Sequence, residues 1–360
     1  MLTCRRQSGK DGGGLQADEH EIRPVSIKGM RMPRRESRPN ALWLGALIVC
    51  TTLFSSRGVA ADNYPSRPVR LIAPYGAGGS YDLIARLLAQ KLSEQFAQQV
   101  IVDNRSGAAG RIGMEIAVKA APDGYTIVTI GNSQIIVPLV YGKAPYDLAR
   151  DIVPITTVAT ITNTLVTHPS LPVQSVSDLV TLAKAKPKTI RFGSGGTGGV
   201  THLMGEMFKS MAGADVTHVP YKAGILSINA VMGGEVQMLF VNAFNAIPLI
   251  QSGKVRGLAV TSLQRSRYLP SLPTLDEAGL KGYELYEFHG IVAPRGLPAD
   301  VAKRLHSEIS RALSSPDLIE KLTAQAAEPS IRSPDQFRQL LKTEHDKYEQ
   351  IVRSVGIKPE

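Results

Sequence analysis

Cysteine is almost absent from this chain. Its 360 residues include two, Cys4 and Cys50, and both precede the small-residue triplet that ends at Ala61. The part of the chain after Ala61 therefore has no disulfide, no thiol nucleophile and no cysteine ligand for a metal. A folded part without thiols is compatible with an oxidising compartment.

Common catalytic motifs are missing as well. The sequence has no G-x-S-x-G nucleophile elbow, no H-E-x-x-H pair and no phosphate loop ending in Gly-Lys-Ser/Thr. The seven histidines are dispersed, and His20 lies near the N-terminus, ahead of the folded part. We therefore expect no enzyme activity, no catalytic residue, no metal and no cofactor.

Positive charge is not concentrated in the folded part. The formal net charge is +10, and residues 1–61 supply half of it, with ten Lys or Arg against five Asp or Glu. The remaining Lys and Arg are scattered among acidic residues, and aromatic residues make up only 6% of the chain. Nucleic-acid binding needs a clustered basic surface, so we expect no nucleic-acid partner.

The start of the chain reads as an export signal. Arg34, Arg35 and Arg38 precede Ala41–Phe54, an apolar run of fourteen residues that is too short to span a bilayer. Small residues ending at Ala61 follow, as signal peptidase cleavage requires. We expect residues 1–61 to be a leader with a cleaved signal peptide, and the mature protein to be periplasmic.

The rest of the chain alternates between two patterns. Short β-rich runs recur from Val69 to Ala293, and the stretches between them have apolar residues at helical spacing. The expected strands are Val69–Ala73, Gln99–Val102, Thr126–Ile130, Ile190–Gly193, Val216–Val219, Met238–Val241, Val255–Thr261 and Ile291–Ala293. Such alternation predicts an α/β fold with parallel sheets and helices on both faces.

Two further kinds of segment complete the expected organisation. The C-terminal part predicts three helices, Ala299–Leu313, Pro316–Ala326 and Pro334–Val355, each preceded by proline or a capping residue. Pro138–Asp151 and His168–Ser177 are rich in Pro, Asp and Ser and interrupt the alternation. We expect these two segments to connect lobes.

Two glycine-rich turns stand between an expected strand and an expected helix. Residues 74–82 read PYGAGGSYD, and residues 193–199 read GSGGTGG. A helix N-terminus has unpaired N–H groups and a partial positive charge, and glycine lets a ligand approach the backbone closely. Both turns are therefore candidate anion sites, built from main-chain donors because neither contains Lys or Arg.

The two turns allow other interpretations. Each turn can also be a tight turn without a ligand. Gly193, Gly195 and Gly198 fit G-x-G-x-x-G, but Asp215 precedes the next expected strand, where it cannot reach a ribose, so a dinucleotide is not expected. Asp82 is expected to interact with the N-terminus of its own helix. His202 either contacts a ligand or caps a helix, and both alternatives remain open.

Several stretches together resemble one protein family. They include YPSRPVRLIAPYGAGGSYDLIARLLAQKLSE, GSGGTGGVTHLMGE, HVPYK and VGIKPE, and the likeness runs from about Tyr64 to Glu360. The chain is similar to the Bug receptors, the extracytoplasmic solute-binding proteins of tripartite tricarboxylate transporters. The resemblance implies a type II periplasmic binding protein, with two Rossmann-like lobes joined by a hinge and a ligand cleft between them.

The resemblance also implies the limits of the lobes and the ligand contacts. We expect lobe 1 to comprise residues 62–161 and 290–360, and lobe 2 residues 162–289. The ligand would be a small mono- or dicarboxylate. The implied contacts are Tyr75, Gly76, Ala77, Gly78, Gly79, Ser80 and Asp82 in lobe 1, and Ser194, Gly195, Gly196, Thr197, Gly198, Thr201, His202 and Tyr221 in lobe 2.

Some residues depart from the family pattern. Ala223, Leu226, Asn229 and Gln237 replace commoner residues in lobe 2, which affects the ligand contacts expected there. The expected protein is a monomer that delivers its ligand to membrane transporter subunits. The alternatives are a sensor that reports to a signalling partner such as a sensor kinase, and an exported enzyme acting on a small carboxylate.

Overall fold

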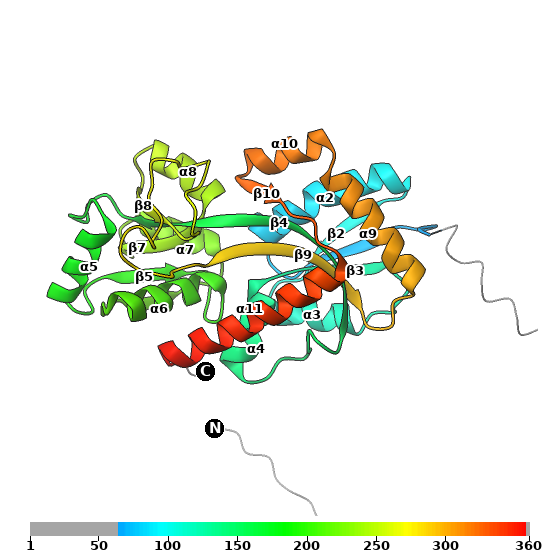
Figure 1. The fold of residues 1–360 in the computed structure, drawn as a ribbon, viewed down its shortest axis with the longest axis horizontal. Coiled ribbons are helices and arrows are strands. Elements are labelled where there is room, and N and C mark those ends of the chain that lie inside the picture. The colour runs from blue at the N-terminus through cyan, green and yellow to red at the C-terminus, as the bar shows by residue number, and fades with distance from the viewer. Residues whose placement is uncertain (1–63, 358–360) are drawn as a thin grey trace, which may run out of the picture. The chain divides into compact units, whose positions relative to one another are not determined.

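The computed structural model describes residues 64–357, drawn in colour in Figure 1. The predicted leader, its apolar run Ala41–Phe54 and the cleavage site at Ala61 lie outside the described residues. Between residues 64 and 357, no helix is both long enough and apolar enough to cross a membrane.

The strands form one continuous path with the order β2-β1-β3-β9-β4-β7-β5-β6. Off this path, β10 pairs with the middle of β4 and β8 pairs with its C-terminal end. The strands are β1 (Val69–Ala73), β2 (Val100–Asn104), β3 (Thr126–Gly131), β4 (Ile152–Thr167), β5 (Arg191–Ser194), β6 (Thr217–Pro220), β7 (Met238–Asn242), β8 (Arg256–Val260), β9 (Tyr286–Pro294) and β10 (Ala327–Pro329). All eight predicted strands are present, with shifted limits in most cases.

The helices cover the sheet on both faces, as the sequence predicts (Figure 1). They are α2 (Ser80–Phe96), the 3-10 turn η2 (Ala108–Gly110), α3 (Arg111–Val118), α4 (Asn132–Tyr141), α5 (Val176–Ala185), α6 (Val200–Ala212), α7 (Gly224–Met232), α8 (Ala243–Gln251), α9 (Ala299–Leu313), α10 (Pro316–Ala324) and α11 (Pro334–Val355).

Strand β1 shows why the sequence reads as it does. Val69 and Leu71 pack in one core cluster with residues of α2 and α9, whereas Ile72 packs in a second cluster with residues of α3 and α4. All three side chains are fully buried. A strand with helices on both faces needs apolar residues at consecutive positions, and β1 has them.

The long strand β4 is missing from the sequence-based prediction. Its first part, Ile152–Thr162, pairs with β9, and its second part, Asn163–Thr167, pairs with β7. Both pairings are antiparallel, so the expected parallel sheets account for only part of the pairing. Parallel pairing holds within β2-β1-β3 and within β6-β5-β7. Pro154 of β4 lies beside a break in the register, where a strand tolerates proline.

The protein is accordingly a mixed α/β fold with two lobes, each containing three parallel strands and joined by β4 and β9 (Figure 1). Strand β4 changes its partner between Thr162 and Asn163, next to the predicted lobe limit at 161/162. The pairing of β9 begins at Tyr286, four residues before the predicted return at residue 290. The lobe limits themselves stay predictions.

The two predicted connections are partly helical. Pro138 lies inside α4, which continues to Tyr141 within the segment expected to be a connection. Two residues of the second segment, Val176 and Ser177, begin α5. Ser175 caps α5, because its side chain accepts a hydrogen bond from the N–H of Asp178.

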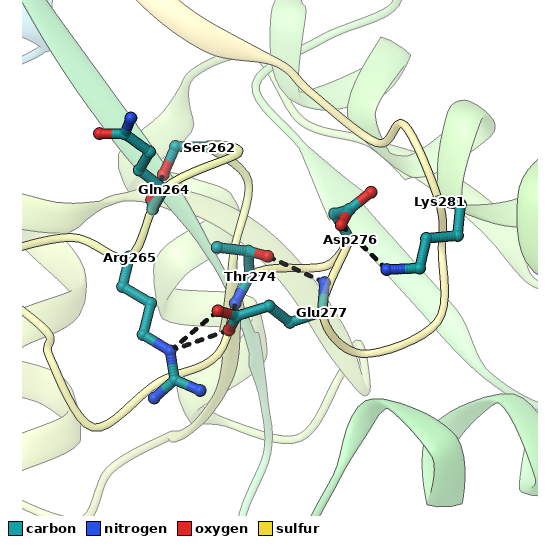
Figure 2. A network of polar contacts seen from close by, with 7 residues as sticks. All are labelled: Ser262, Gln264, Arg265, Thr274, Asp276, Glu277 and Lys281. Atoms are coloured by element: carbon teal, nitrogen blue, oxygen red, sulfur yellow. Dashed lines mark hydrogen bonds and ion pairs between the residues drawn. The ribbon is translucent and has the colours of Figure 1, made fainter.

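The connection between β8 and β9 is held by polar contacts rather than by regular structure (Figure 2). Thr274 Oγ1 accepts from the N–H of Glu277, and a carboxylate oxygen of Glu277 accepts from the N–H of Thr274. The Arg265 side chain donates to both carboxylate oxygens of Glu277, and Lys281 pairs with Asp276 at 3.1 Å. These bonds stabilise the segment between β8 and β9, which lies within the part of the chain that resembles the family. The segment is not part of either glycine turn.

Candidate functional site

The first glycine turn joins β1 to α2, and Asp82 fixes its shape. One carboxylate oxygen of Asp82 accepts from the N–H of Gly78 at 2.9 Å, and the other accepts from the Asn104 amide at 3.0 Å. Arg86 pairs with the same carboxylate at 2.9 Å. Burial alone would raise the pKa of Asp82, but these hydrogen bonds hold it below its usual range. Asp82 thus interacts with the start of its own helix, as the sequence predicts.

Glycine is required by the backbone at Gly78 in this turn. Its φ is +83°, in the left-handed region that side chains disfavour. Gly79 is the N-cap of α2 with φ −87°, and a Cβ there would meet only the Gly76 carbonyl oxygen, at 3.7 Å. Gly76 and Ala77 complete the exposed part of the turn.

Two tyrosines border the first turn. The Tyr75 and Tyr81 ring centroids are 4.6 Å apart, and Tyr75 donates from its hydroxyl to the Ala109 carbonyl at 3.0 Å. Tyr81 donates to the side-chain oxygen of Gln134 at 3.0 Å. Burial raises the pKa of Tyr75 to about 12, so its phenol is neutral at physiological pH. The first turn therefore lies between α2 and the beginning of α4.

The second glycine turn joins β5 to α6 and uses several of its own amides. The N–H of Gly195 donates to Thr201 Oγ1, that of Gly196 to Ser194 Oγ, and that of Gly198 to His202 Nδ1, at 3.2–3.3 Å. These three N–H groups are therefore engaged within the protein. The expectation that Gly195, Gly196 and Gly198 contact the ligand stays a prediction.

His202 caps the second turn. Its ring stacks on that of His218 at 4.0 Å, and His218 Nε2 is 2.6 Å from Ser194 Oγ. Burial lowers the pKa of His202 to about 4 and that of His218 to about 3. Both rings are neutral near pH 7, which lets His202 Nδ1 accept the Gly198 N–H.

Tyr221 contributes to the second turn through its backbone. Its N–H donates to the Ser194 carbonyl at 3.0 Å, and its own carbonyl oxygen lies 3.5 Å from where a Cβ on Gly196 would be. The ring packs against the apolar cluster of α7 and β7. Burial, together with Glu235, raises the pKa of Tyr221 to about 12. A ligand contact from its ring stays a prediction.

A chain of contacts links the two turns, and sequence reasoning missed it. Tyr75 bonds to Ala109, and Arg111 two residues later holds its guanidinium 5.1 Å from the ring centroid of Tyr141. Tyr141 then donates from its hydroxyl to the Thr197 carbonyl at 3.0 Å. The only sequence signal was the glycine-rich stretch after β2, which contains Ala109 and Arg111.

Three helix starts near these contacts share one feature. The N-cap residues of α2, α4 and α6 are Gly79, Gly131 and Gly199, which have no side chain to cap the helix. The N–H groups of each first helical turn therefore lack an N-cap side chain as partner, although at α4 the Gln134 side chain accepts from the N–H of Gly131 at 2.8 Å. They offer hydrogen bonds and partial positive charge to an anion. Among residues 64–357, no cluster of His, Cys, Asp and Glu is suited to hold a metal ion.

The residues of the predicted lobe 2 that depart from the family pattern lie in different parts of the structure. A Cβ on Gly195 would lie 3.2 Å from the Gly224 N–H nitrogen, so Ala223, the N-cap of α7, adjoins the second turn. Leu226 is partly exposed on the first turn of α7. Gln237 instead accepts from the Arg191 N–H and donates to the Gly234 carbonyl, which holds the start of β5.

Several known proteins are similar to this chain in sequence and fold. BugT of Bordetella pertussis is 35% identical over 305 residues, covering 83% of this chain and 93% of BugT. An R. palustris protein solved with adipate is 35% identical with a TM-score of 0.79, covering 82% of this chain and all of that one. MatC of Rhodopseudomonas palustris, solved with bound malate, is 25% identical with a TM-score of 0.75, covering 80% of this chain and all of MatC.

The family assignment follows from the sequence as well. Residues 84–357 match the family described as tripartite tricarboxylate transporter family receptor. The resemblance to the Bug receptors is thereby confirmed, and so is the two-lobed fold of a periplasmic binding protein. The chain belongs to the receptors of the tripartite tricarboxylate transporter family, and it is a periplasmic solute-binding protein.

Proposed function

We propose that this receptor captures a small mono- or dicarboxylate between its two glycine turns and delivers it to the membrane subunits of a tripartite tricarboxylate transporter. The observation that supports this most is the set of helix starts at Gly79, Gly131 and Gly199, which lack capping side chains. The carboxylate class agrees with the adipate and malate of two similar structures.

The donors for the ligand are the first-turn N–H groups of the helices. The amides of Gly78, Gly195, Gly196 and Gly198 already donate within the protein. Ligand oxygens therefore bind at Ser80 and Tyr81 on α2, and at Val200 and Thr201 on α6. Neither turn contains Lys or Arg, so main-chain donors supply most of the affinity.

The remaining parts of the proposal concern export and motion. Cleavage near Ala61 releases a monomeric mature protein into the periplasm. A ligand that contacts both lobes favours the arrangement in which they are close, so binding compacts the protein. The lobes are residues 62–161 with 290–360, and residues 162–289.

Differential scanning fluorimetry tests the proposal. A ligand at 100 times its Kd adds about 2.7 kcal/mol to the free energy of unfolding, or roughly 5–10 °C in melting temperature for a lobe of this size. We expect such a shift for some acid among C3–C7 mono- and dicarboxylates. The matched controls are the corresponding amides, which keep the carbon chain but lack the charge. Equal shifts for acids and amides contradict anion capture.

A further inference from the structure

A buried polar cluster lies beneath the first turn, and the proposed function assigns it no role. Ser80 Oγ donates to Glu287 Oε2 at 3.0 Å, and His289 Nε2 lies 3.6 Å from the same oxygen. Glu287 is 6% exposed and His289 1%. Within the described residues, neither ring nitrogen of His289 has a hydrogen-bond partner.

The cluster is positioned by strand pairing. Glu287 and His289 lie two residues apart on β9, so their side chains share one face of the sheet. His289 pairs with Gly131, the N-cap of α4, while Ser80 is the first residue of α2. The cluster therefore lies between the start of α2, which is proposed to bind the ligand, and the start of α4. Tyr81 packs edge-on against His289, with ring centroids 4.7 Å apart.

The negative charge of Glu287 acts on Tyr75, which borders the first turn, where the ligand is proposed to bind. The pKa of Tyr75 is raised mainly by burial, and the negative charge of Glu287 adds to that effect. A second carboxylate bound at the start of α2 is repelled by Glu287, because like charges in a partly buried site interact strongly. A plain carboxylate is thus a poor complement to this site.

The same cluster offers hydrogen-bonding capacity to a ligand. The contacts of Glu287 with Ser80 and with His289 both involve its oxygen Oε2, and neither involves Oε1. The buried imidazole of His289 has no hydrogen-bond partner, which is costly unless a donor or acceptor meets it. A hydroxyl or ammonium group beside the ligand carboxylate supplies that partner and offsets the repulsion.

We propose that Glu287 and His289 select ligands with a hydrogen-bond donor on the carbon next to the carboxylate, in the form of a hydroxyl or an ammonium group. The inference rests on the proposed function and narrows its ligand class. The carboxylate binds the first-turn N–H groups of α2, and the adjacent donor meets Glu287 and His289.

Isothermal titration calorimetry on matched acids tests this selection. Each set contains a plain dicarboxylate, its 2-hydroxy acid and its 2-amino acid of the same chain length. The four-carbon set is succinate, malate and aspartate, and the five-carbon set is glutarate, 2-hydroxyglutarate and glutamate. The third set contains the six-carbon equivalents. In the wild-type protein we expect the hydroxy or amino acid of the binding length to have a Kd about tenfold lower than the plain acid. The two substituted acids tell a hydroxyl from an ammonium preference.

The variant Glu287→Gln removes the charge and keeps an acceptor for Ser80. It should bind the plain acid more tightly than wild type does and bring the ratio of Kd values to within about threefold. Tighter binding of one ligand cannot result from damage to the fold. If this variant does not fold, Glu287→Asp replaces it, because this substitution moves the carboxylate back by one methylene. The preference for the substituted acid over the plain acid should then also become weaker.

The control is Glu94→Gln on α2, the helix that begins at Ser80. Glu94 is 58% exposed and lies 3.5 Å from Lys91. It should leave every Kd ratio unchanged. Equal Kd values for plain and substituted acids in the wild type overturn the selection, and an unchanged ratio in Glu287→Gln overturns its assignment to this cluster. If no acid of any set binds, the proposed function itself fails.

Discussion

The hydroxyl of Tyr141 donates a hydrogen bond to the carbonyl of Thr197 at 3.0 Å, which joins the end of α4 to the second glycine turn. The ring of Tyr141 occupies the space next to Gly198, where a Cβ would lie 2.9 Å from Tyr141 Cε2. Gly198 also has φ +78°. Glycine is therefore needed at this position for two independent reasons, the left-handed backbone and the space that the Tyr141 ring fills.

Gly198→Ala should weaken ligand binding by at least about tenfold, because the added methyl group pushes the second turn away from Tyr141. The left-handed φ costs a further 1–2 kcal/mol or so of folding stability. The control is Gly279→Ala, where φ is +105° but a Cβ would meet no atom within 4 Å. It should lower the melting temperature and leave Kd unchanged. Equal losses of affinity in the two variants would contradict the role of the contact.

Asp82→Asn should destabilise the protein by about 1–3 kcal/mol at pH 7, because a charged, buried acceptor of three bonds is lost. The pKa of Asp82 is lowered in the folded state, so the carboxylate stabilises the fold above its unfolded pKa of about 3.9. That contribution is lost as the pH falls through the folded pKa. Urea midpoints should therefore differ between variant and wild type at pH 7 and converge below about pH 4.

The histidine pair predicts a second dependence on pH. The folded pKa values of about 4 for His202 and about 3 for His218 lie below the unfolded value of about 6.5. Between these values the unfolded chain binds more protons, so stability falls as the pH drops from about 6.5 towards 4. The double variant His202→Gln, His218→Gln should show a flatter pH profile of urea midpoints. An identical slope would contradict the account of the two buried rings.

Export can be tested on protein secreted into the periplasm. N-terminal sequencing should find Ala61 or Asp62 at the start of the mature chain, because small residues end the predicted signal there. A start at Met1 or Met30 would show that the leader is not cleaved.

Much of the fold was predictable because local patterns determine it. Strand β1 matches its expected limits, and the two glycine turns lie between strand and helix as predicted. Strand β4 was not predicted, although IVPITTVATITNTLVT is rich in β-branched residues. Its partners β9 and β7 are distant in sequence, and β4 pairs with both in antiparallel fashion. No local sequence pattern indicates that a strand will join two parallel sheets in this way.

The site was predictable only in part. Glycine turns at helix starts have a sequence pattern, so Ser80 and Thr201 could be named as candidates from the sequence. Tyr141, Glu287 and His289 were missed, because strand pairing and helix packing bring them to the turns from elsewhere in the chain. The occupied amides of Gly196 and Gly198 also depend on side chains whose orientation sequence alone does not give.

The most direct test of the account is a crystal structure of the protein with the carboxylate that stabilises it most. We predict carboxylate oxygens within about 3 Å of first-turn N–H groups of α2 and α6. The N–H groups of Gly196 and Gly198 should keep their bonds to Ser194 and His202. A ligand held by an Arg or Lys side chain, or bound away from both glycine turns, would contradict capture by main-chain donors.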